Sequence, residues 1–292
     1  MVFLLLSIIC NAAVYLIFKY FEQKGVRLFP AITVNYITAL TIGLLVVPDM
    51  KLALEGAAKT PAWLVGGLLL GFSFISVFYL MAITAQRIGV SVTTVASKMS
   101  LALAMVLFLL IRPEEKFNVF KGLGLLFAIA GVVLSSMKEG SNSFSWKQLG
   151  WPLLILVGST IVDFGIAYFS SGPSNDSELA LYSCLSFGMA AACGVSIMIY
   201  KVIFQKVEIS RKDVLGGICL GMINYGSIYF LVLSYNTKLL PESSLLPVNN
   251  LCVVVLGSFA AVMLFKEKLS KANIAGIVLS VLAIALLIWG EL

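Results

Sequence analysis

Long apolar runs separated by short polar stretches dominate the chain from one end to the other. The hydrocarbon core of a bilayer is about 30 Å thick, and a helix needs about 20 mostly apolar residues to cross it. Ten segments come near that length: residues 2–19, 29–47, 62–85, 89–111, 118–137, 150–170, 178–200, 213–235, 242–265 and 271–290. The pattern therefore predicts an all-α integral membrane protein with ten transmembrane helices and short connections.

The composition narrows the class of function. Of the 292 residues, 60% are hydrophobic, 12% are charged and none is histidine, whereas soluble domains have about 25% charged residues. The five cysteines lack the spacing of a metal site, and no G-x-x-x-x-G-K-[ST] phosphate loop occurs. The net charge of +6 fits basic loops beside anionic lipid, not a nucleic-acid surface. We expect no catalytic residues, metal or cofactor, and only a small-molecule substrate and the bilayer as partners.

Lysine and arginine are unevenly distributed between the connections. Those after odd-numbered segments carry about twice as many as the others. Because cytoplasmic loops are enriched in these residues, we expect a multi-pass protein of the bacterial inner (plasma) membrane with both termini outside the cytoplasm. A monomer and a homodimer both remain open.

The chain also repeats itself. The stretch WLVGGLLLG (63–71) resembles VLGGICLG (214–221) at a shift of 150, and residues 114–134 resemble 266–286 at a shift of 152. The matched glycines themselves are interpreted as packing residues. Five spans per half is an odd number, so two such halves, 1–140 and 141–292, would insert in opposite orientations. Inverted repeats of this kind are typical of secondary transporters that bind their substrate near the midplane.

The ninth predicted span and its surroundings, residues 243–288, carry a recognisable pattern. A proline lies within the span, a glutamate follows the apolar run and a glycine opens the last helix: Pro247, Glu267 and Gly276. In the first half Glu115 and Gly124 match, whereas Val95 stands at the position of the proline. The chain thus resembles the EamA-like, ten-helix branch of the drug/metabolite transporter superfamily. The resemblance implies two inverted five-helix halves around a central cavity, and leaves the substrate open.

Lys98 lies well inside the fourth span and is not part of that family pattern. A lysine near the middle of a spanning helix costs about 2.5–3.5 kcal/mol, so it needs a partner, a wet cavity or a ligand. Alternatively, its stem reaches the membrane face about 12 Å away. Asp163 in the sixth span lies at similar depth, which predicts an opposite-charge pair, structural or opened by substrate or a proton. The alternative for Asp163 is a protonated acid bonded to Ser159 or Thr160.

Further polar side chains fall within the spans. Asn249 and Asn250 follow Pro247, which lacks an amide donor and loosens the helix around it. They are interpreted either as part of a substrate site or as hydrogen bonds between helices. The remaining candidates for the lining of a cavity, with packing as the alternative for the tyrosines, are Asn35, Asn224, Tyr79 and Tyr229.

Together these features predict a secondary active transporter of a small polar metabolite, an amino-acid-like or other carboxylate-bearing solute, moved by alternating access. Lys98 would bind the anionic group, Asn249 and Asn250 would orient the rest, and Asp163 would balance or gate the lysine. The alternatives are an exporter of amphipathic compounds or drugs and a membrane-embedded lipid-handling protein. Proton coupling and the direction of transport stay open.

Overall fold

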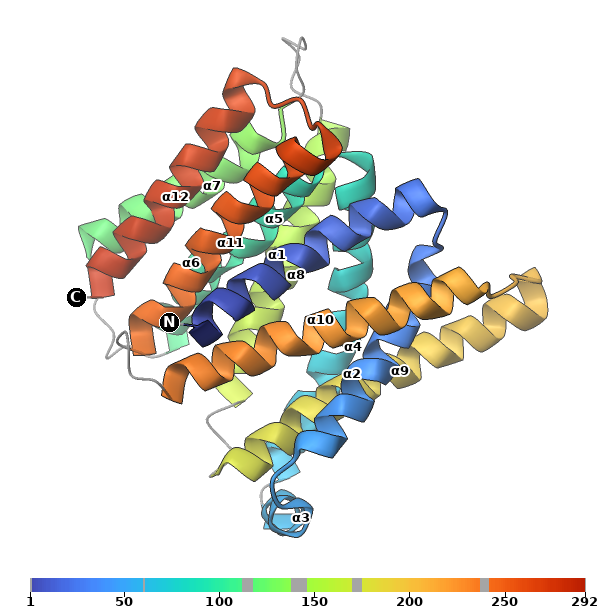
Figure 1. Cartoon of the computed structure of the whole chain (residues 1–292). Helices are drawn as coiled ribbons and strands as arrows, with labels where there is room; N and C mark the ends of the chain where they lie inside the picture. Colours follow the sequence, from blue (N-terminus) through green and yellow to red (C-terminus); the bar gives the residue numbers. More distant parts are fainter. Residues whose placement is uncertain are drawn as a thin grey trace. The chain divides into compact units, whose positions relative to one another are not determined.

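The computed structural model describes residues 2–59, 61–111, 118–137, 146–169, 175–236 and 242–291. The regular structure in these ranges is helical (Figure 1). The helices are α1 (Val2–Lys24), α2 (Leu28–Val46), α3 (Met50–Lys59), α4 (Pro61–Arg87), α5 (Val90–Lys98), α6 (Ser100–Ile111), α7 (Val119–Ser135), α8 (Trp146–Phe169), α9 (Asp176–Gln205), α10 (Arg211–Asn236), α11 (Glu242–Phe265) and α12 (Lys271–Glu291).

Eight of the described helices are long and apolar enough to cross a membrane: α1, α2, α4, α8, α9, α10, α11 and α12. They also carry large apolar side chains on their outer faces, such as Leu69, Phe259 and Leu264, each more than 60% exposed. Helices suit hydrocarbon because each satisfies its own backbone hydrogen bonds. The prediction of an all-α integral membrane protein is confirmed.

The fourth and fifth predicted spans differ from this pattern, so ten long helices are not confirmed. The fifth is the 17-residue helix α7. The fourth is divided at Met99 into α5 and α6. Around Met99 the backbone forms a tighter turn, in which the Ala102 amide donates to the Met99 carbonyl at 3.1 Å. The Ser100 hydroxyl donates to the Ser97 carbonyl. Such hydroxyl-to-backbone bonds compete with the helical pattern, which accounts for a break that was not predicted.

The chain divides into two compact units, which are described separately. The first unit comprises Met1–Tyr20, Leu80–Ile161 and Gly226–Leu292, and the second comprises Phe21–Tyr79 and Val162–Tyr225. Each unit thus contains residues from before and after position 140. The predicted halves, 1–140 and 141–292, describe a repeat in the sequence rather than these units, and that division stays a prediction.

In the first unit, α7 and α12 form an antiparallel seam of close contact. A Cβ placed on Gly124 would lie 2.7 Å from the Leu287 side chain, and one on Gly276 would lie 2.8 Å from the Gly131 carbonyl oxygen. Small residues let two helix backbones approach in this way.

Asparagines close both ends of this seam. The Asn273 amide nitrogen donates to the carbonyls of Ser135 at 2.7 Å and Met137 at 2.8 Å, where α7 ends. At the other end, the Asn118 amide nitrogen donates to the Gly290 carbonyl at 2.7 Å. These side chains bond helix-end carbonyls that have no partner within their own helix, so the seam is glycine-packed and capped at both ends.

A carboxylate covers the beginning of α5, which packs against α11. Glu267 accepts hydrogen bonds from the Val90 amide at 2.6 Å, the Ser91 amide at 3.3 Å and the Ser91 hydroxyl at 2.9 Å. Gly89 precedes α5 with φ +147°, a conformation that L side chains rarely adopt. A carboxylate at a helix N-terminus satisfies free amides and interacts favourably with the helix dipole. The glutamate of the family pattern therefore has a structural partner in α5.

The second unit is built around the antiparallel pair α2 and α9. A Cβ on Gly43 would lie 2.8 Å from the Cys184 sulfur, and one on Gly194 would lie 2.8 Å from the Thr33 hydroxyl. Aromatic rings fill the space beside this pair: the Phe187 ring lies 6.2 Å from the Tyr36 ring and 6.4 Å from the Tyr225 ring, measured between centroids.

Two further helices contact this pair through glycines. Gly217 and Gly221 of α10 approach α2, where a Cβ on Gly221 would lie 2.7 Å from the Asn35 carbonyl oxygen. Gly67 and Gly71 of α4 approach α9, where a Cβ on Gly71 would lie 2.6 Å from the Met189 side chain.

Candidate functional site

A group of hydroxyl side chains surrounds Ser97, at the break between α5 and α6 in the first unit. The Tyr15 hydroxyl of α1 donates to the Ser97 oxygen at 3.1 Å, and the Ser159 hydroxyl of α8 lies 3.4 Å from the same oxygen. The Ser97 hydroxyl in turn lies 3.9 Å from the Met81 sulfur of α4. Tyr15, Ser97 and Ser159 are all buried. Four helices therefore direct side chains to one point.

Lys98 is the last residue of α5 and lies directly before the break. Its side chain is half-buried, and its ammonium nitrogen lies 6.0 Å from the centre of the Tyr15 ring. That distance is at the limit of a cation–π interaction. The ammonium group thus lies close to the ring whose hydroxyl contacts Ser97.

Asp163 is half-buried in α8 and belongs to the second unit. Its predicted pairing with Lys98 therefore stays a prediction. Of the two hydroxyls named as alternative partners, Ser159 is directed to Ser97, and Thr160 donates to the Leu156 carbonyl at 2.6 Å.

Asn249 of α11 is completely buried and only partly hydrogen-bonded. The Ser7 hydroxyl of α1 is 3.2 Å from the Asn249 side-chain oxygen and 2.8 Å from the Ser227 carbonyl. The Asn249 amide nitrogen has no hydrogen-bond partner in the part of the chain that the structure describes. Leaving a buried donor unsatisfied costs about 1–3 kcal/mol. Such a group favours a ligand that supplies the missing acceptor. The neighbouring Asn250 is also buried.

The structure brings two of the predicted asparagines together in the second unit. The Asn224 amide nitrogen donates to the Asn35 side-chain oxygen at 3.2 Å, and both residues are buried. Among the described residues the Asn35 amide nitrogen, like that of Asn249, has no acceptor. The pair therefore joins α10 to α2. The Asn35 amide nitrogen that lacks an acceptor fits the polar lining that the sequence predicted.

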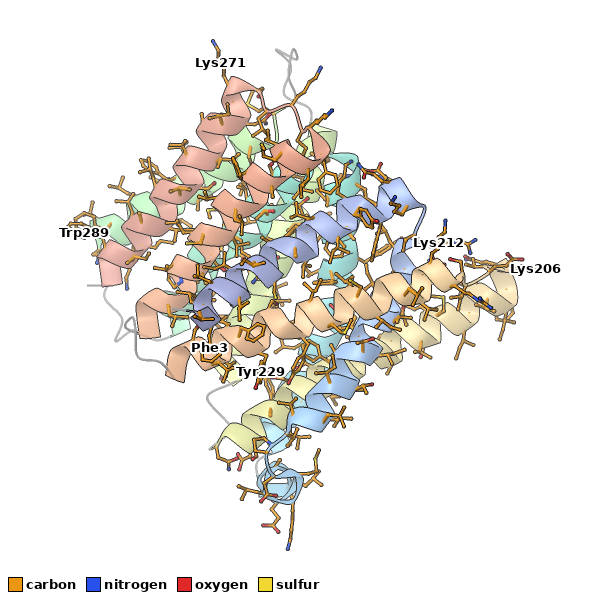
Figure 2. All side chains as sticks on the ribbon, viewed as in Figure 1. Phe3, Lys206, Lys212, Tyr229, Lys271 and Trp289 are labelled. Carbon is orange, nitrogen blue, oxygen red and sulfur yellow. The ribbon has the colours of Figure 1, made fainter. Side chains whose placement is uncertain are left out.

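The two tyrosines proposed for the lining make aromatic contacts. Tyr79 lies edge-on to Phe29 with the ring centroids 5.5 Å apart, in the second unit. Tyr229 lies edge-on to Phe230 at 5.7 Å in the first unit and is 37% exposed (Figure 2). These contacts are those of packing residues, the alternative that the sequence left open. A role for either in the lining stays a prediction.

Sequence reasoning missed three residues that make polar contacts in the first unit: Ser7, Tyr15 and Ser97. Each lies in an apolar helix, where a single serine or tyrosine has the same local pattern as a packing residue. The position of Ser97 beside Lys98 was an available signal. The partners of these residues were not predictable from local sequence, because 82 residues separate Tyr15 from Ser97 and 242 separate Ser7 from Asn249.

The chain is similar to known proteins in sequence and in fold. Residues 1–137 match the family described as the EamA-like transporter family. An uncharacterized protein of Haemophilus influenzae is 28% identical over 290 residues, which cover 96% of this chain and 95% of that protein. A crystal structure of another protein matches 98% of this chain and 94% of its own, with a TM-score of 0.58 and 17% identity. The structural match is a likeness of fold.

Proposed function

We propose that this chain, whose residues 1–137 match the EamA-like transporter family, is a secondary active transporter of small carboxylate-bearing solutes. In this proposal it works by alternating access. The observation that carries the proposal is the interrupted fourth span, with the Lys98 ammonium and the hydroxyls of Ser97 and Tyr15 beside the interruption. Met99 keeps helical dihedral angles of φ −76° and ψ −9°, and a tighter turn of this kind within a helix often marks a functional hinge.

Helix pairing supports the inverted repeat that this mechanism needs. Counting α5 and α6 as one interrupted span and α7 as another gives ten spans. The second packs on the seventh (α2 and α9), the fourth on the ninth (α5 and α11) and the fifth on the tenth (α7 and α12). Each of these spans therefore contacts the span five positions later. A two-fold axis in the membrane plane produces such self-equivalent, antiparallel pairs.

The matched glycines support the same repeat. Gly67 and Gly71 correspond in sequence to Gly217 and Gly221. The first pair contacts α9 and the second contacts α2. Because α2 and α9 are themselves counterparts, equivalent glycines make equivalent contacts. We therefore interpret residues 1–140 and 141–292 as two inverted halves of one transporter.

The chemistry of two polar side chains of the first unit favours an anionic solute. The Lys98 ammonium supplies a positive charge, and the Asn249 amide nitrogen supplies a buried donor that has no acceptor in the described structure. Carboxylate oxygens accept hydrogen bonds and carry the opposite charge. Asp163 remains the proposed counter-charge of Lys98 in the empty site, and the proposed lining includes Asn250, Asn35, Asn224, Tyr79 and Tyr229.

The basic connections support the proposed location. We place the protein in the bacterial inner membrane with both termini outside the cytoplasm, because most lysines and arginines then face the cytoplasm. An accessibility assay on single cysteines introduced at Lys206 and at Lys238 would test this orientation. Labelling of position 206 from outside intact cells would contradict it.

Exchange in proteoliposomes tests the transport proposal. Vesicles loaded with amino acids and other polar carboxylates would be sampled by mass spectrometry, with and without a pH gradient. We expect wild type to move a carboxylate-bearing solute. Lys98→Ala should lower its rate about 10–100-fold, which corresponds to the loss of one charged hydrogen bond. Dependence on the pH gradient would show proton coupling.

Lys271→Ala is the matched control, because Lys271 is an exposed lysine of the same unit at the start of α12. It should transport as wild type does. Equal rates for Lys98→Ala and Lys271→Ala would contradict the role of Lys98. Movement of uncharged amphipathic compounds alone would favour the exporter instead.

A further inference from the structure

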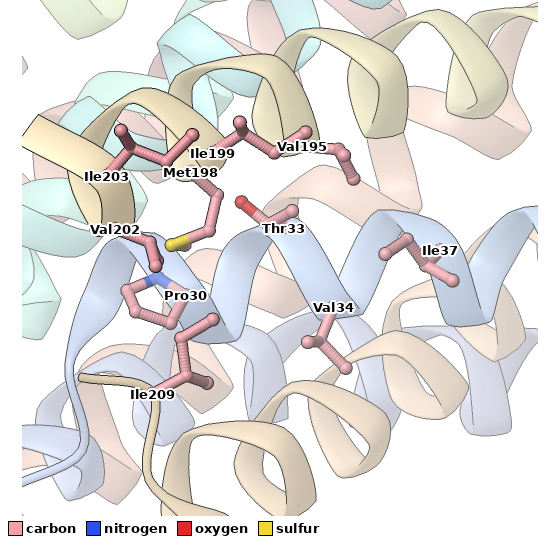
Figure 3. A pocket seen from close by; sticks show the side chains of 10 residues that line it. All are labelled: Pro30, Thr33, Val34, Ile37, Val195, Met198, Ile199, Val202, Ile203 and Ile209. Atoms are coloured by element: carbon pink, nitrogen blue, oxygen red, sulfur yellow. The ribbon is translucent and has the colours of Figure 1, made fainter. Parts of the chain in front are cut away.

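An apolar groove runs between α2 and α9 in the second unit, far in sequence from the polar group around Ser97. It encloses a cavity of about 430 Å³, shown in Figure 3. Its lining consists of Pro30, Thr33, Val34, Ile37, Val195, Met198, Ile199, Val202, Ile203 and Ile209. Thr33 and Met198 are buried, whereas Ile37 and Ile203 are exposed by 41% and 62%. The groove therefore has a buried floor and open walls.

The groove offers little to a polar molecule. Among its lining residues only Thr33 has a side chain that donates hydrogen bonds, and this hydroxyl already donates to the Phe29 carbonyl at 3.0 Å. A polar solute would lose its bonds to water without replacement, which is unfavourable. An apolar occupant gains by burial instead.

The length of the groove fits one membrane leaflet. At a rise of 1.5 Å per residue, its α2 wall from Pro30 to Ile37 is about 10 Å long, and its α9 wall from Val195 to Ile203 is about 12 Å long. Half of the hydrocarbon core is about 15 Å. Both walls lie at the ends of their helices, since α2 begins at Leu28 and α9 ends at Gln205. The groove thus extends from a membrane face toward the midplane.

Basic residues outnumber acidic ones in the segments at the end of the groove. Val202 and Ile209 also line an adjoining, more polar cavity of about 620 Å³, whose lining includes Lys206 and Glu208. Figure 2 shows Lys206 and Lys212 near the connection between α9 and α10. The segments 22–27 and 201–213 together contain six basic residues and three acidic ones. Of the acidic ones, Asp213 is buried and accepts bonds from the Arg27 and Ser210 amides.

We propose that this groove binds one acyl chain of an anionic phospholipid, with Lys206 contacting the phosphate of the headgroup. The apolar walls, their one-leaflet length and the basic residues at the membrane face all match that single class of molecule. Basic clusters beside transmembrane helices attract anionic headgroups by about 1 kcal/mol per cation. None of the residues that line the groove belongs to the proposed transport site, so this inference does not rest on the proposed function.

Lipid titration of the full-length protein tests the headgroup contact. The purified protein in a neutral detergent would be titrated with phosphatidylglycerol or with phosphatidylcholine of identical acyl chains, and bound lipid would be counted by native mass spectrometry. We expect phosphatidylglycerol to bind at least fivefold more tightly. Lys206→Gln should weaken the binding of phosphatidylglycerol about fivefold, in line with one cation. It should weaken the binding of phosphatidylcholine less, because the choline cation already offsets the phosphate charge of that lipid. Lys271→Gln, an exposed lysine of the first unit, is the matched control.

A groove-filling variant tests the acyl-chain contact. Val202→Trp should weaken the binding of both lipids at least fivefold. Val255→Trp, on an exposed face of α11, should leave the binding of both lipids unchanged. Equal affinity for the two lipids, or an unchanged affinity in Lys206→Gln, would overturn the proposal. So would a Val202→Trp variant that keeps its lipid and changes the oligomeric state, because the groove would then bind a second copy. Lys206 is exposed, so its variant is expected to fold.

Discussion

The α7–α12 seam and the contact between α1 and α11 lie in the same unit and use asparagine differently. In the seam, the Asn273 amide nitrogen donates to carbonyls at the end of α7. In α11, Asn249 accepts a bond from Ser7, and its amide nitrogen has no partner among the described residues. One asparagine is therefore saturated and the other is not.

Whether the amide nitrogen has an acceptor distinguishes polar groups that hold helices together from polar groups that are available to bind a ligand. Inside a membrane no water replaces a missing bond, so a structural polar group is expected to have its partners in the folded chain. A donor that stays unsatisfied costs free energy, and a binding site can recover that cost when a substrate enters. Four changes would sharpen or break this comparison.

The largest effect is expected from Gly276→Ala in the seam. A Cβ at this position would lie 2.8 Å from the Gly131 carbonyl oxygen, and backbone cannot yield as a side chain can. We expect the free energy of unfolding to fall by about 2–3 kcal/mol, measured by denaturation in detergent. Gly150→Ala is the matched control, because a Cβ there would meet nothing within 4 Å. Equal stability of the two variants would show that the seam is loosely packed.

Asn273→Ala should follow, with a loss of about 2 kcal/mol in the free energy of unfolding. The side chain makes several hydrogen bonds to the end of α7, and bonds between helices in membranes contribute about 0.6 kcal/mol each, with larger values where helix-end carbonyls are left unsatisfied. The measurement is the same denaturation curve. An unchanged denaturation curve would show that the hydrogen bonds of Asn273 do not stabilise the seam, which would contradict the comparison with Asn249.

Asn249→Ala should affect transport more than stability. The Ser7 hydroxyl keeps its bond to the Ser227 carbonyl, and the unsatisfied donor disappears. We therefore expect the free energy of unfolding to change by less than about 0.6 kcal/mol. The rate of solute exchange should fall about fivefold, as for one neutral hydrogen bond. A loss of stability equal to that of Asn273→Ala, with normal transport, would make Asn249 a structural residue.

Tyr15→Phe should have the smallest effect. It removes the hydroxyl that donates to Ser97 and keeps the ring beside Lys98. We expect about a threefold rise in KM with kcat unchanged, because one weak hydrogen bond in the site is lost. Tyr20→Phe, at an exposed position of the same helix, is the control. A fall in kcat alone would indicate a role in the conformational change instead.

The membrane class and the long helices could be predicted because hydropathy is a local property of the chain. The predicted segments 242–265 and 271–290 correspond to α11 (Glu242–Phe265) and α12 (Lys271–Glu291) almost residue for residue. The break at Met99 could not be predicted in this way. Residues 100–111 are strongly apolar, and the interruption depends on how the Ser100 hydroxyl at their start bonds to the Ser97 carbonyl.

Residues of the candidate site could be predicted where burial in the membrane costs free energy, as for a charged side chain. Residues without such a cost could not be recognised from the sequence. Lys98 was identified because a charge in hydrocarbon demands an explanation. Tyr15 and Ser97 carry no such cost in isolation, and their significance comes from contacts across the fold. Asn273 was missed for the same reason, since it lies in the sequence as one polar residue at the start of a helix.

The contact between Glu267 and α5 has a consequence for the order in which the chain is made. Val90 and Glu267 are 177 residues apart. A ribosome adds roughly 5–20 residues per second, so the first amides of α5 exist for roughly 9–35 s before their carboxylate partner is synthesised. The early spans enter the membrane during that interval, while α5 still lacks the cap that it has in the finished protein. Completion of the first unit is therefore one of the last events of biosynthesis.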